Sequence, residues 1–153
     1  DLTGRNGLKL SDYWRGGMRT KHGTHVAGFP NAFIVQPTQG ANLISNVPHN
    51  LTESGKTIAA IVRHALDQGA QEVEVSEAAE ADWLELLLQG PGRMIGAQDC
   101  TPGYYNNEGQ AASPGAKYHV GYPHGATAYF EYLRNWRSDG NFGGLVFRPK
   151  HAD

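Results

Sequence analysis

The stretch FPNAFIVQPTQGANLISNVP, residues 29–48, decides how the sequence around it is interpreted. Pro30 and Asn31 predict a turn, and the apolar run that follows, Ala32–Val35, is closed by a second proline. A short apolar run between two turns is typical of a buried, often parallel, strand. We therefore expect a strand at 32–35 that leads, through a loop of small and amide residues, into a helix.

The segment after this loop carries the clearest helical pattern in the chain. Apolar residues recur at intervals of three and four over 58–66, and Gly69 provides a C-terminal stop. The expected buried stripe consists of Ile58, Ile61, Val62, Ala65 and Leu66. A strand, loop and helix in this order present backbone N–H groups and the positive end of the helix dipole to a ligand. Side chains that could add donors are Thr52, Ser54 and the amides of Gln39, Asn42 and Asn46. From the pattern alone, an ordinary crossover without a ligand is an equally good interpretation.

The elements flanking this region are shorter. Residues 1–20 carry two turn signals around alternating leucines, which predict a short exposed strand or hairpin edge. Val73 and Val75 alternate with glutamates and indicate a strand with one solvent-facing side. Ser76 is a candidate N-cap for the helix that follows. The expected buried residues of that helix are Leu84, Leu87 and Leu88.

Residues 90–117 show no periodicity and predict a long loop, which in a compact domain is usually functional. Beyond it we expect a strand at 118–123, a helix at 124–139 and a closing strand at 142–149. One face of the helix would carry Tyr129, Phe130, Leu133 and Trp136. The resulting order of strands and helices is typical of an α/β protein.

Composition and charge narrow the classes of function. The 153 residues suffice for one domain with a single core, and a net charge of −2 gives no electrostatic basis for binding nucleic acid or an anionic membrane. The one cysteine, Cys100, cannot form an internal disulfide, and neither a signal-peptide pattern nor a long apolar run is present. We therefore expect a cytoplasmic protein with no nucleic-acid or membrane partner.

The motif HGTHVAG, residues 22–28, resembles the segment that carries the catalytic histidine of subtilisin-like proteases. Such a protease also needs a serine nucleophile and a helix that starts at the histidine. No GTSMA-like serine segment occurs, and Pro30 would end any helix after one turn. We therefore expect His22 and His25 on a connecting segment with Val26 packed inside. The seven histidines show no spacing typical of a metal site, so no metal is expected.

Several segments together resemble the C-terminal part of Baeyer–Villiger monooxygenases, a family of flavoproteins that use FAD and NADPH. In chain order they are GRNGLKLSDYW (4–14), AGFPN through IAAIV (27–62), EAAEADWLELL (77–87), FEYLRNW (130–136) and FGGLVF (142–147). The most specific part is GFPN with its apolar strand, followed by SNVP at the start of the long helix. The resemblance runs in order over nearly the whole chain.

The resemblance implies a fold and a cofactor site. The chain would be the C-terminal portion of an α/β flavoprotein with two Rossmann-like dinucleotide-binding domains, and it would include an additional α+β region. Residues 1–70 would complete the FAD-binding domain, and residues 71–153 would form the α+β region, with a mobile loop at 90–117. The loop and helix after the 32–35 strand would approach the flavin ring, where backbone N–H groups stabilise negative charge. The FAD contacts implied in this way are Gln36, Pro37, Asn46 and Val47.

The resemblance also implies contacts for the other reactants. The substrate cavity beside the flavin ring would be lined by Leu43, Ile44 and Val47. The residues implied to contact NADP and the substrate from the long loop are Thr101, Tyr104, Tyr105 and Asn106.

The reaction implied is the oxidation of a ketone to an ester or lactone with O2 and NADPH through a C4a-peroxyflavin. Such enzymes carry two GxGxxG motifs and an essential arginine, and neither the motifs nor the arginine segment occurs in these residues. We therefore expect an inactive fragment with no catalytic residue of its own, whose partner is the N-terminal part of the same enzyme. The alternatives are a stand-alone binding module without catalysis and, less favoured, a subtilisin-like protease.

Overall fold

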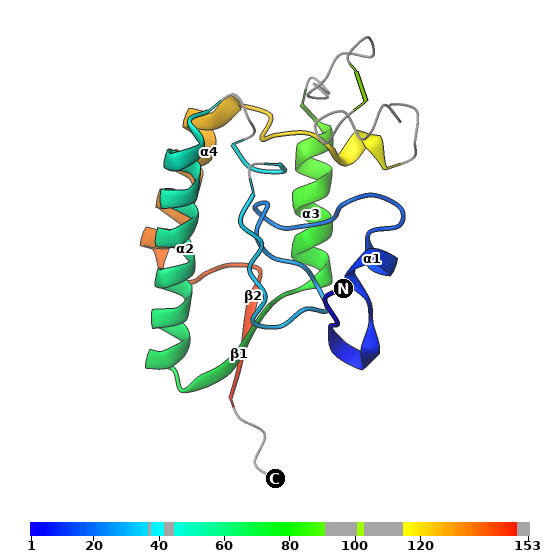
Figure 1. Cartoon of the computed structure of the whole chain (residues 1–153). Coiled ribbons are helices and arrows are strands. Elements are labelled where there is room, and N and C mark those ends of the chain that lie inside the picture. The colour runs from blue at the N-terminus through cyan, green and yellow to red at the C-terminus, as the bar shows by residue number, and fades with distance from the viewer. Residues whose placement is uncertain (37, 42–44, 91–100, 103–114, 150–153) are drawn as a thin grey trace.

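The computed structural model describes residues 1–36, 38–41, 45–90, 101–102 and 115–149. In chain order the elements are η1 (Arg5–Gly7), α1 (Leu10–Tyr13), α2 (Val47–Asp67), β1 (Ala70–Val75), α3 (Glu77–Leu88), η3 (Ala116–Tyr118), α4 (Gly125–Asp139) and β2 (Leu145–Pro149). Figure 1 shows α2 and α3 on either side of the irregular segment that precedes α2, with α4 behind α2 and the two strands below. This irregular segment therefore occupies the centre of the molecule.

Helix α2 confirms the predicted long helix and its start near Pro48. The predicted buried stripe is wrong for Val62 and Leu66, which are exposed, because the helix instead buries the side that carries Asn50, Glu53, Thr57 and Ile61. Asn46 is the N-cap, since its side chain accepts a hydrogen bond from the backbone N–H of His49 at 3.1 Å. Pro48 occupies the first turn, where the helix does not require its missing N–H. After Asp67 the chain turns at Gly69, whose φ of 65° lies in the left-handed region that glycine adopts without strain.

Helix α3 begins as predicted, because the Ser76 side chain accepts a hydrogen bond from the N–H of Ala79. Its buried side contains Glu80, Trp83, Leu84 and Leu87. The prediction that Leu88 is buried is wrong: this residue lies at the edge of the stripe and is exposed. Helix α4 places Tyr129, Phe130 and Leu133 in the core and leaves Trp136 half-buried, as its pattern predicted.

The described sheet consists of β1 and β2, which pair antiparallel with Val73 opposite Phe147 and Val75 opposite Leu145. The closing strand is thus confirmed. The expected solvent-facing side of β1 is wrong for Glu74, which is buried because Arg5, Arg148 and the N–H of Gly28 bind its carboxylate.

Three predicted strands are absent from this sheet. Segment 32–36 is extended, but Ile34 donates to the carbonyl of Thr24 and no ladder forms along it among the described residues. Segment 118–123 bonds instead to residues 38–41, called the central loop below, through the N–H of Tyr122 and the carbonyl of Gly40 at 2.8 Å. Near the N-terminus, a single bridge joins Thr3 and Lys9 around a turn, and α1 follows directly. An apolar pattern permits a strand, but a neighbouring strand is needed to form one.

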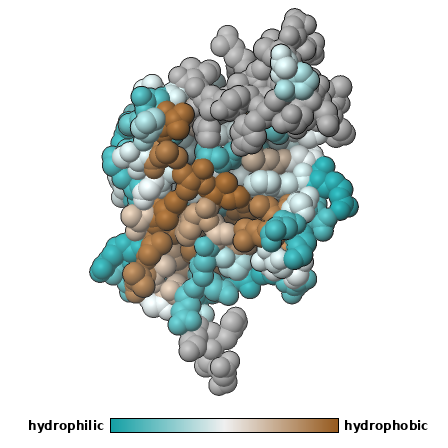
Figure 2. Space-filling view, in the orientation of Figure 1, coloured by the Kyte–Doolittle hydropathy of each residue, from teal (hydrophilic) through white to brown (hydrophobic). Residues whose placement is uncertain are grey.

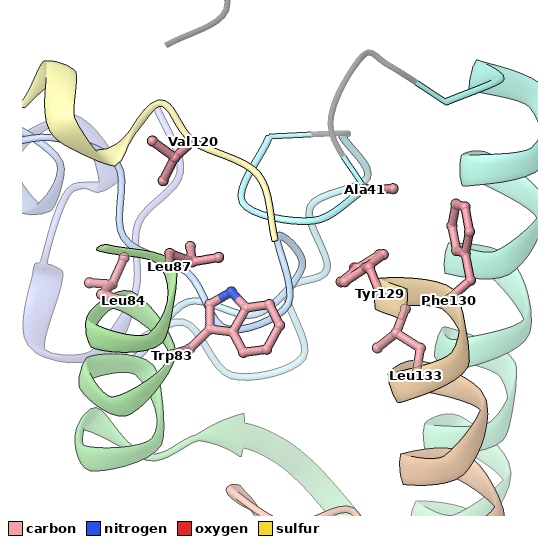
Figure 3. Packing of buried hydrophobic residues seen from close by; sticks show 8 residues of the cluster. All are labelled: Ala41, Trp83, Leu84, Leu87, Val120, Tyr129, Phe130 and Leu133. Carbon is pink, nitrogen blue, oxygen red and sulfur yellow. The ribbon is translucent and has the colours of Figure 1, made fainter. Parts of the chain in front are cut away.

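The main core lies between α3, α4 and the central loop. Figure 3 shows Trp83, Leu84 and Leu87 on α3 and Tyr129, Phe130 and Leu133 on α4, with Val120 near the α3 residues and Ala41 near Tyr129. A smaller cluster joins Ile61 of α2, Val73 of β1 and Phe142. Among the described helices, none combines the length and the uniform apolarity that crossing a bilayer requires.

Candidate functional site

The start of α2 is the part of the predicted cofactor site that the structure describes best. Asn46 and Val47 are both exposed, and the Val47 side chain is 45% accessible. A helix supplies no partner for the N–H groups at its start. His49 is capped by Asn46, Pro48 has no N–H, and Asn50 donates to the carbonyl of Asn46 at 3.1 Å. The helix therefore leaves the N–H groups of Asn46 and Val47 without a helical partner, at its exposed and electropositive end.

An open groove adjoins this helix start on the side of α4. It has a volume of about 510 Å³ and is lined by Ser45, His49, Ala126, Thr127, Phe130 and Arg134. The His49 ring meets the edge of Phe130, with 4.6 Å between the ring centroids. The surroundings of Asn46 and Val47 are thus open rather than sealed within a core.

Gln36, the first predicted FAD contact, is half-buried. Its side-chain N–H donates to the carbonyl of Thr38 at 3.0 Å. The side-chain nitrogen of Gln36 therefore binds the loop itself.

Two further predicted donors bond to other groups of the chain. Gln39 is 0% exposed, so the prediction that its amide offers a donor to a ligand is wrong. The Thr52 hydroxyl donates to the carbonyl of Pro48 within α2, at 2.9 Å. Burial obliges Gln39 to bond within the chain, whereas Thr52 lies on the exposed surface of α2.

Thr101 is exposed. The remaining predicted site residues lie outside the described residues: Pro37, Leu43, Ile44, Tyr104, Tyr105 and Asn106, as does the candidate donor Asn42.

The histidines of the HGTH turn lie in the core and not at a helix start. Lys21 and His25 are bridged across the turn, and His22 has a φ of 59°. His22 Nε2 lies 3.1 Å from the hydroxyl of Tyr132, and the ring packs edge-on against Trp83 at 4.7 Å. Burial lowers the pKa of His22 well below its usual value and that of His25 to about 3. Within the described part of the chain, neither ring bonds to a serine or an aspartate, so the protease alternative fails and the connecting-segment prediction, with Val26 buried, is confirmed.

Buried carboxylates are the polar feature that sequence reasoning missed. Glu80 is 0% exposed and accepts hydrogen bonds from Tyr13 at 2.6 Å, Arg19 at 3.1 Å and the N–H of Ala27 at 3.0 Å. Burial, together with the hydrogen bond to Glu80, raises the pKa of Tyr13 to about 12. The partners lie more than fifty residues away in sequence, so no local signal distinguishes Glu80 from the surface glutamates of the same helix. Across the described ranges, no three His, Cys, Asp or Glu side chains converge as metal ligands would.

Comparison with known proteins connects this geometry to a family, although no protein-family model matches the chain. Pentalenolactone D synthase of Streptomyces exfoliatus is 39% identical over 149 residues, which is 97% of this chain and 25% of the relative. The FAD-binding monooxygenase hmp7 of Hypomyces subiculosus is 37% identical over 145 residues, 94% of this chain and 24% of the relative. A Baeyer–Villiger monooxygenase of Streptomyces coelicolor is 39% identical over 140 residues, 90% of this chain and 22% of the relative.

The chain is homologous to one part of the Baeyer–Villiger monooxygenases. It spans about a quarter of the length of the curated relatives it matches. The polycyclic ketone monooxygenase of Thermothelomyces thermophila superimposes on it with a TM-score of 0.83 at 28% identity, over 97% of this chain and 24% of that structure. A steroid monooxygenase bound to NADP superimposes with a TM-score of 0.74 at 19% identity, over 97% of this chain and 26% of that structure. The match is to the C-terminal part of the Baeyer–Villiger fold, which confirms the resemblance drawn from the sequence.

Proposed function

We propose that this chain belongs to an FAD- and NADPH-dependent monooxygenase that inserts one oxygen atom of O2 into a ketone beside its carbonyl, giving an ester or lactone. The observation that carries the proposal is the similarity to Baeyer–Villiger enzymes over 90–97% of the chain. The names of the relatives and neighbours, which include FAD, NADP and ketone substrates, support the cofactors and the substrate class. The catalytic arginine and both GxGxxG motifs would lie in the remainder of the enzyme.

The exposed start of α2 fits a place beside the flavin. When bound, FAD supplies the redox and oxygen chemistry, and the protein supplies binding and electrostatics. The N–H groups of Asn46 and Val47 would face the pyrimidine side of the ring, where the reduced flavin carries negative charge. The positive end of the α2 dipole would stabilise that charge, and Gln36 would contribute through the backbone of the loop.

A second observation supports the proposal that residues 1–70 complete a larger domain. Helix α2 carries an outward stripe of Val47, Leu51, Val62 and Leu66, whose side chains are 45%, 48%, 41% and 66% exposed. Val35, in the extended segment beside α2, is also exposed. Figure 2 shows a hydrophobic band across the front of the molecule, over the region where Figure 1 places α2. Contiguous exposed apolar surface of this kind marks an interface.

The proposed occupant of this band is the N-terminal part of the same enzyme, since three quarters of the relatives' length has no counterpart in this chain. Segment 32–36 would gain a neighbouring strand there and complete the predicted sheet. The α+β region over 71–153 would follow, with Thr101, Tyr104, Tyr105 and Asn106 toward NADP and the substrate. Leu43, Ile44 and Val47 would line the ketone site. A stand-alone binding module is the less favoured candidate, because it leaves this band without an occupant.

The experiment starts from the purified complete protein. We expect the absorbance bands of a bound oxidised flavin, ketone-stimulated oxidation of NADPH, and an ester or lactone detected by mass spectrometry with cyclohexanone and a polycyclic ketone as probes. A protein that binds no flavin, or that oxidises NADPH without ever forming an oxygenated product, would contradict the proposal.

Two substitutions of Asn46 test the role of the helix start. Asp and Ser both cap helices well, so Asn46→Asp and Asn46→Ser should retain α2. Only Asn46→Asp adds a negative charge where the reduced ring would lie, so it should lower the midpoint potential of the flavin and slow its reduction by NADPH. Equal potentials in the two variants would place the flavin elsewhere.

A further inference from the structure

Gln39 connects several segments of the chain through hydrogen bonds of its side chain. Its side-chain oxygen accepts a hydrogen bond from the Thr20 hydroxyl at 2.6 Å. Its side-chain nitrogen donates to the carbonyls of Met18 at 2.8 Å and Tyr118 at 3.0 Å. The whole side chain is removed from solvent. Both N–H donors of the side-chain amide are therefore used. An apolar side chain at this position would leave the groups that Gln39 binds without their hydrogen-bond partner.

The backbone of Gln39 is held equally firmly. Its N–H donates to the carbonyl of Val120 at 2.9 Å, and its carbonyl accepts from the indole of Trp83 at 3.0 Å. The residue has a φ of 60°, in the left-handed region that non-glycine residues occupy only when their surroundings impose it. One residue thus fastens the loop to the segment after α1, to α3 and to the segment before α4.

The layer beneath the loop leaves it little room to move. A Cβ added at Gly23 would lie 2.7 Å from the carbonyl oxygen of Thr38, and one added at Gly40 would lie 2.9 Å from the Tyr129 hydroxyl. That hydroxyl donates to the carbonyl of His22 at 2.8 Å. Residues 38–41 therefore pack closely against the buried HGTH turn.

We propose that Gln39 is a positioning residue for the flavin site: it fixes the loop that leads into α2, and through it the place of the Asn46 and Val47 N–H groups. The proposal rests on the proposed function. Only four residues separate Ala41 from Asn46, so a shift of the anchored loop passes to the helix start within a short length of chain. Misplacing such groups by about 1 Å can cost about two orders of magnitude in rate, although Gln39 itself touches no reactant.

The test compares Gln39→Leu with Thr57→Val in the complete holoenzyme. Gln39→Leu keeps the bulk of the side chain and removes its three hydrogen bonds. Thr57 is also buried, and its hydroxyl donates to the carbonyl of Glu53 and accepts from Arg137 on the inner face of α2, so Thr57→Val loses buried polarity away from the loop. The two variants are compared at temperatures equally far below their melting points.

For Gln39→Leu we expect a lower flavin midpoint potential and, with NADPH, O2 and cyclohexanone, a rise of about threefold or more in hydrogen peroxide released per NADPH oxidised. We expect kcat to fall by about tenfold while the KM for NADPH changes less than about twofold. Thr57→Val should match the wild type in potential and in peroxide yield.

Two further variants keep the proposal testable if Gln39→Leu does not fold. Thr20→Val removes only the hydroxyl donor and should shift the same quantities in the same direction by a smaller factor. Gln39→Glu restores one donor when its carboxyl is protonated, so its peroxide yield should approach that of the wild type as the pH is lowered.

The possible results distinguish a failure of the positioning role from a failure of the proposed function. A wild-type protein without flavin or ketone-dependent NADPH oxidation overturns both. An active wild type whose Gln39 and Thr20 variants keep its potential and peroxide yield, or change them no more than Thr57→Val does, overturns the positioning role alone.

Discussion

The inner side of α2 buries polar residues, whereas its outer side exposes apolar residues. Its inner side buries polar groups and pairs them: Glu53 is bound by Lys56 and Arg137, and Thr57 by Arg137. The hydrogen bond from Lys56, with those from Arg137, outweighs burial and lowers the pKa of Glu53 to about 2. Its outer side exposes apolar residues, Leu66 most of all. A helix in a finished domain shows the reverse pattern.

This difference indicates which contacts form within the chain and which require another part of the enzyme. Among the described residues, the buried carboxylates Glu53, Glu74 and Glu80 all have donors from within the chain. Along the outer stripe the sequence provides apolar side chains, and the surface they need belongs to another part of the enzyme. On the closed side, where buried polar groups are paired within the chain, substitutions should lower the stability in every context. On the open side, the outer stripe of α2, they should lower it only in the complete enzyme.

The largest effect is expected on the closed side, from Glu80→Ala. Removing this carboxylate leaves Tyr13, Arg19 and the N–H of Ala27 without their acceptor, which should lower the free energy of unfolding by about 3–5 kcal/mol. Urea unfolding of the complete protein measures it. The exposed Glu85 of the same helix is the control, and Glu85→Ala should stay within about 0.5 kcal/mol of the wild type. Equal losses would mean that Glu80 is not part of a closed network.

On the open side we expect one substitution to change the unfolding free energy differently in the isolated chain and in the complete enzyme. Leu66→Ala should change the unfolding free energy of the isolated 153-residue chain by less than about 0.5 kcal/mol, because the side chain is exposed. In the complete enzyme the same change should cost about 2–3 kcal/mol, since the covered leucine would leave a cavity. Arg63→Ala, on the neighbouring surface of α2, should have a small effect in both. A Leu66 effect that is equally small in both contexts would show that nothing covers the stripe.

The buried histidines predict acid sensitivity of the closed side. His25 is held neutral, with its pKa lowered from 6.5 to about 3 by burial and the nearby Lys21. On acidification the unfolded chain takes up the proton first, so stability is lost as the pH falls below about 6.5, by about 2 kcal/mol between pH 7 and pH 5. His25→Gln should show a shallower pH dependence over this interval in thermal unfolding. An unchanged slope would contradict the assignment. The loss from Glu53 falls in a separate window, below pH 4.5.

The smallest effect is expected at the boundary between the two sides, the start of α2. Asn46→Ala removes the cap on the His49 N–H and should cost about 1 kcal/mol, whereas Asn46→Ser should cost less. Circular dichroism of the melting transition measures both. Equal melting temperatures for Ala and Ser would show that the cap adds no stability.

Local signals were enough wherever a feature depends on neighbours in sequence. The start of α2 at Asn46 and Pro48, its end before Gly69, and the Ser76 cap of α3 follow from side chains within one helical turn. The aromatic face of α4 follows from its period. The placement of the candidate flavin loop before α2 follows from the family resemblance.

Features that depend on distant partners could not be predicted in this way. Glu74 and Glu80 have the sequence context of surface glutamates, and Gln39 that of a loop donor. Segment 32–36 has a strand pattern but no neighbour among the described residues with which to form one.

The sequence by itself determined the three long helices α2, α3 and α4, the caps of α2 and α3, and the family to which this segment is related, because these depend on short-range patterns and on ordered motifs. Only the tertiary structure decided which polar groups are buried and which apolar face is open. The physical reason is that desolvation depends on every segment that packs around a group: Gln39 is enclosed by residues 18–20, α3 and 118–120, and Leu66 by none that the structure describes.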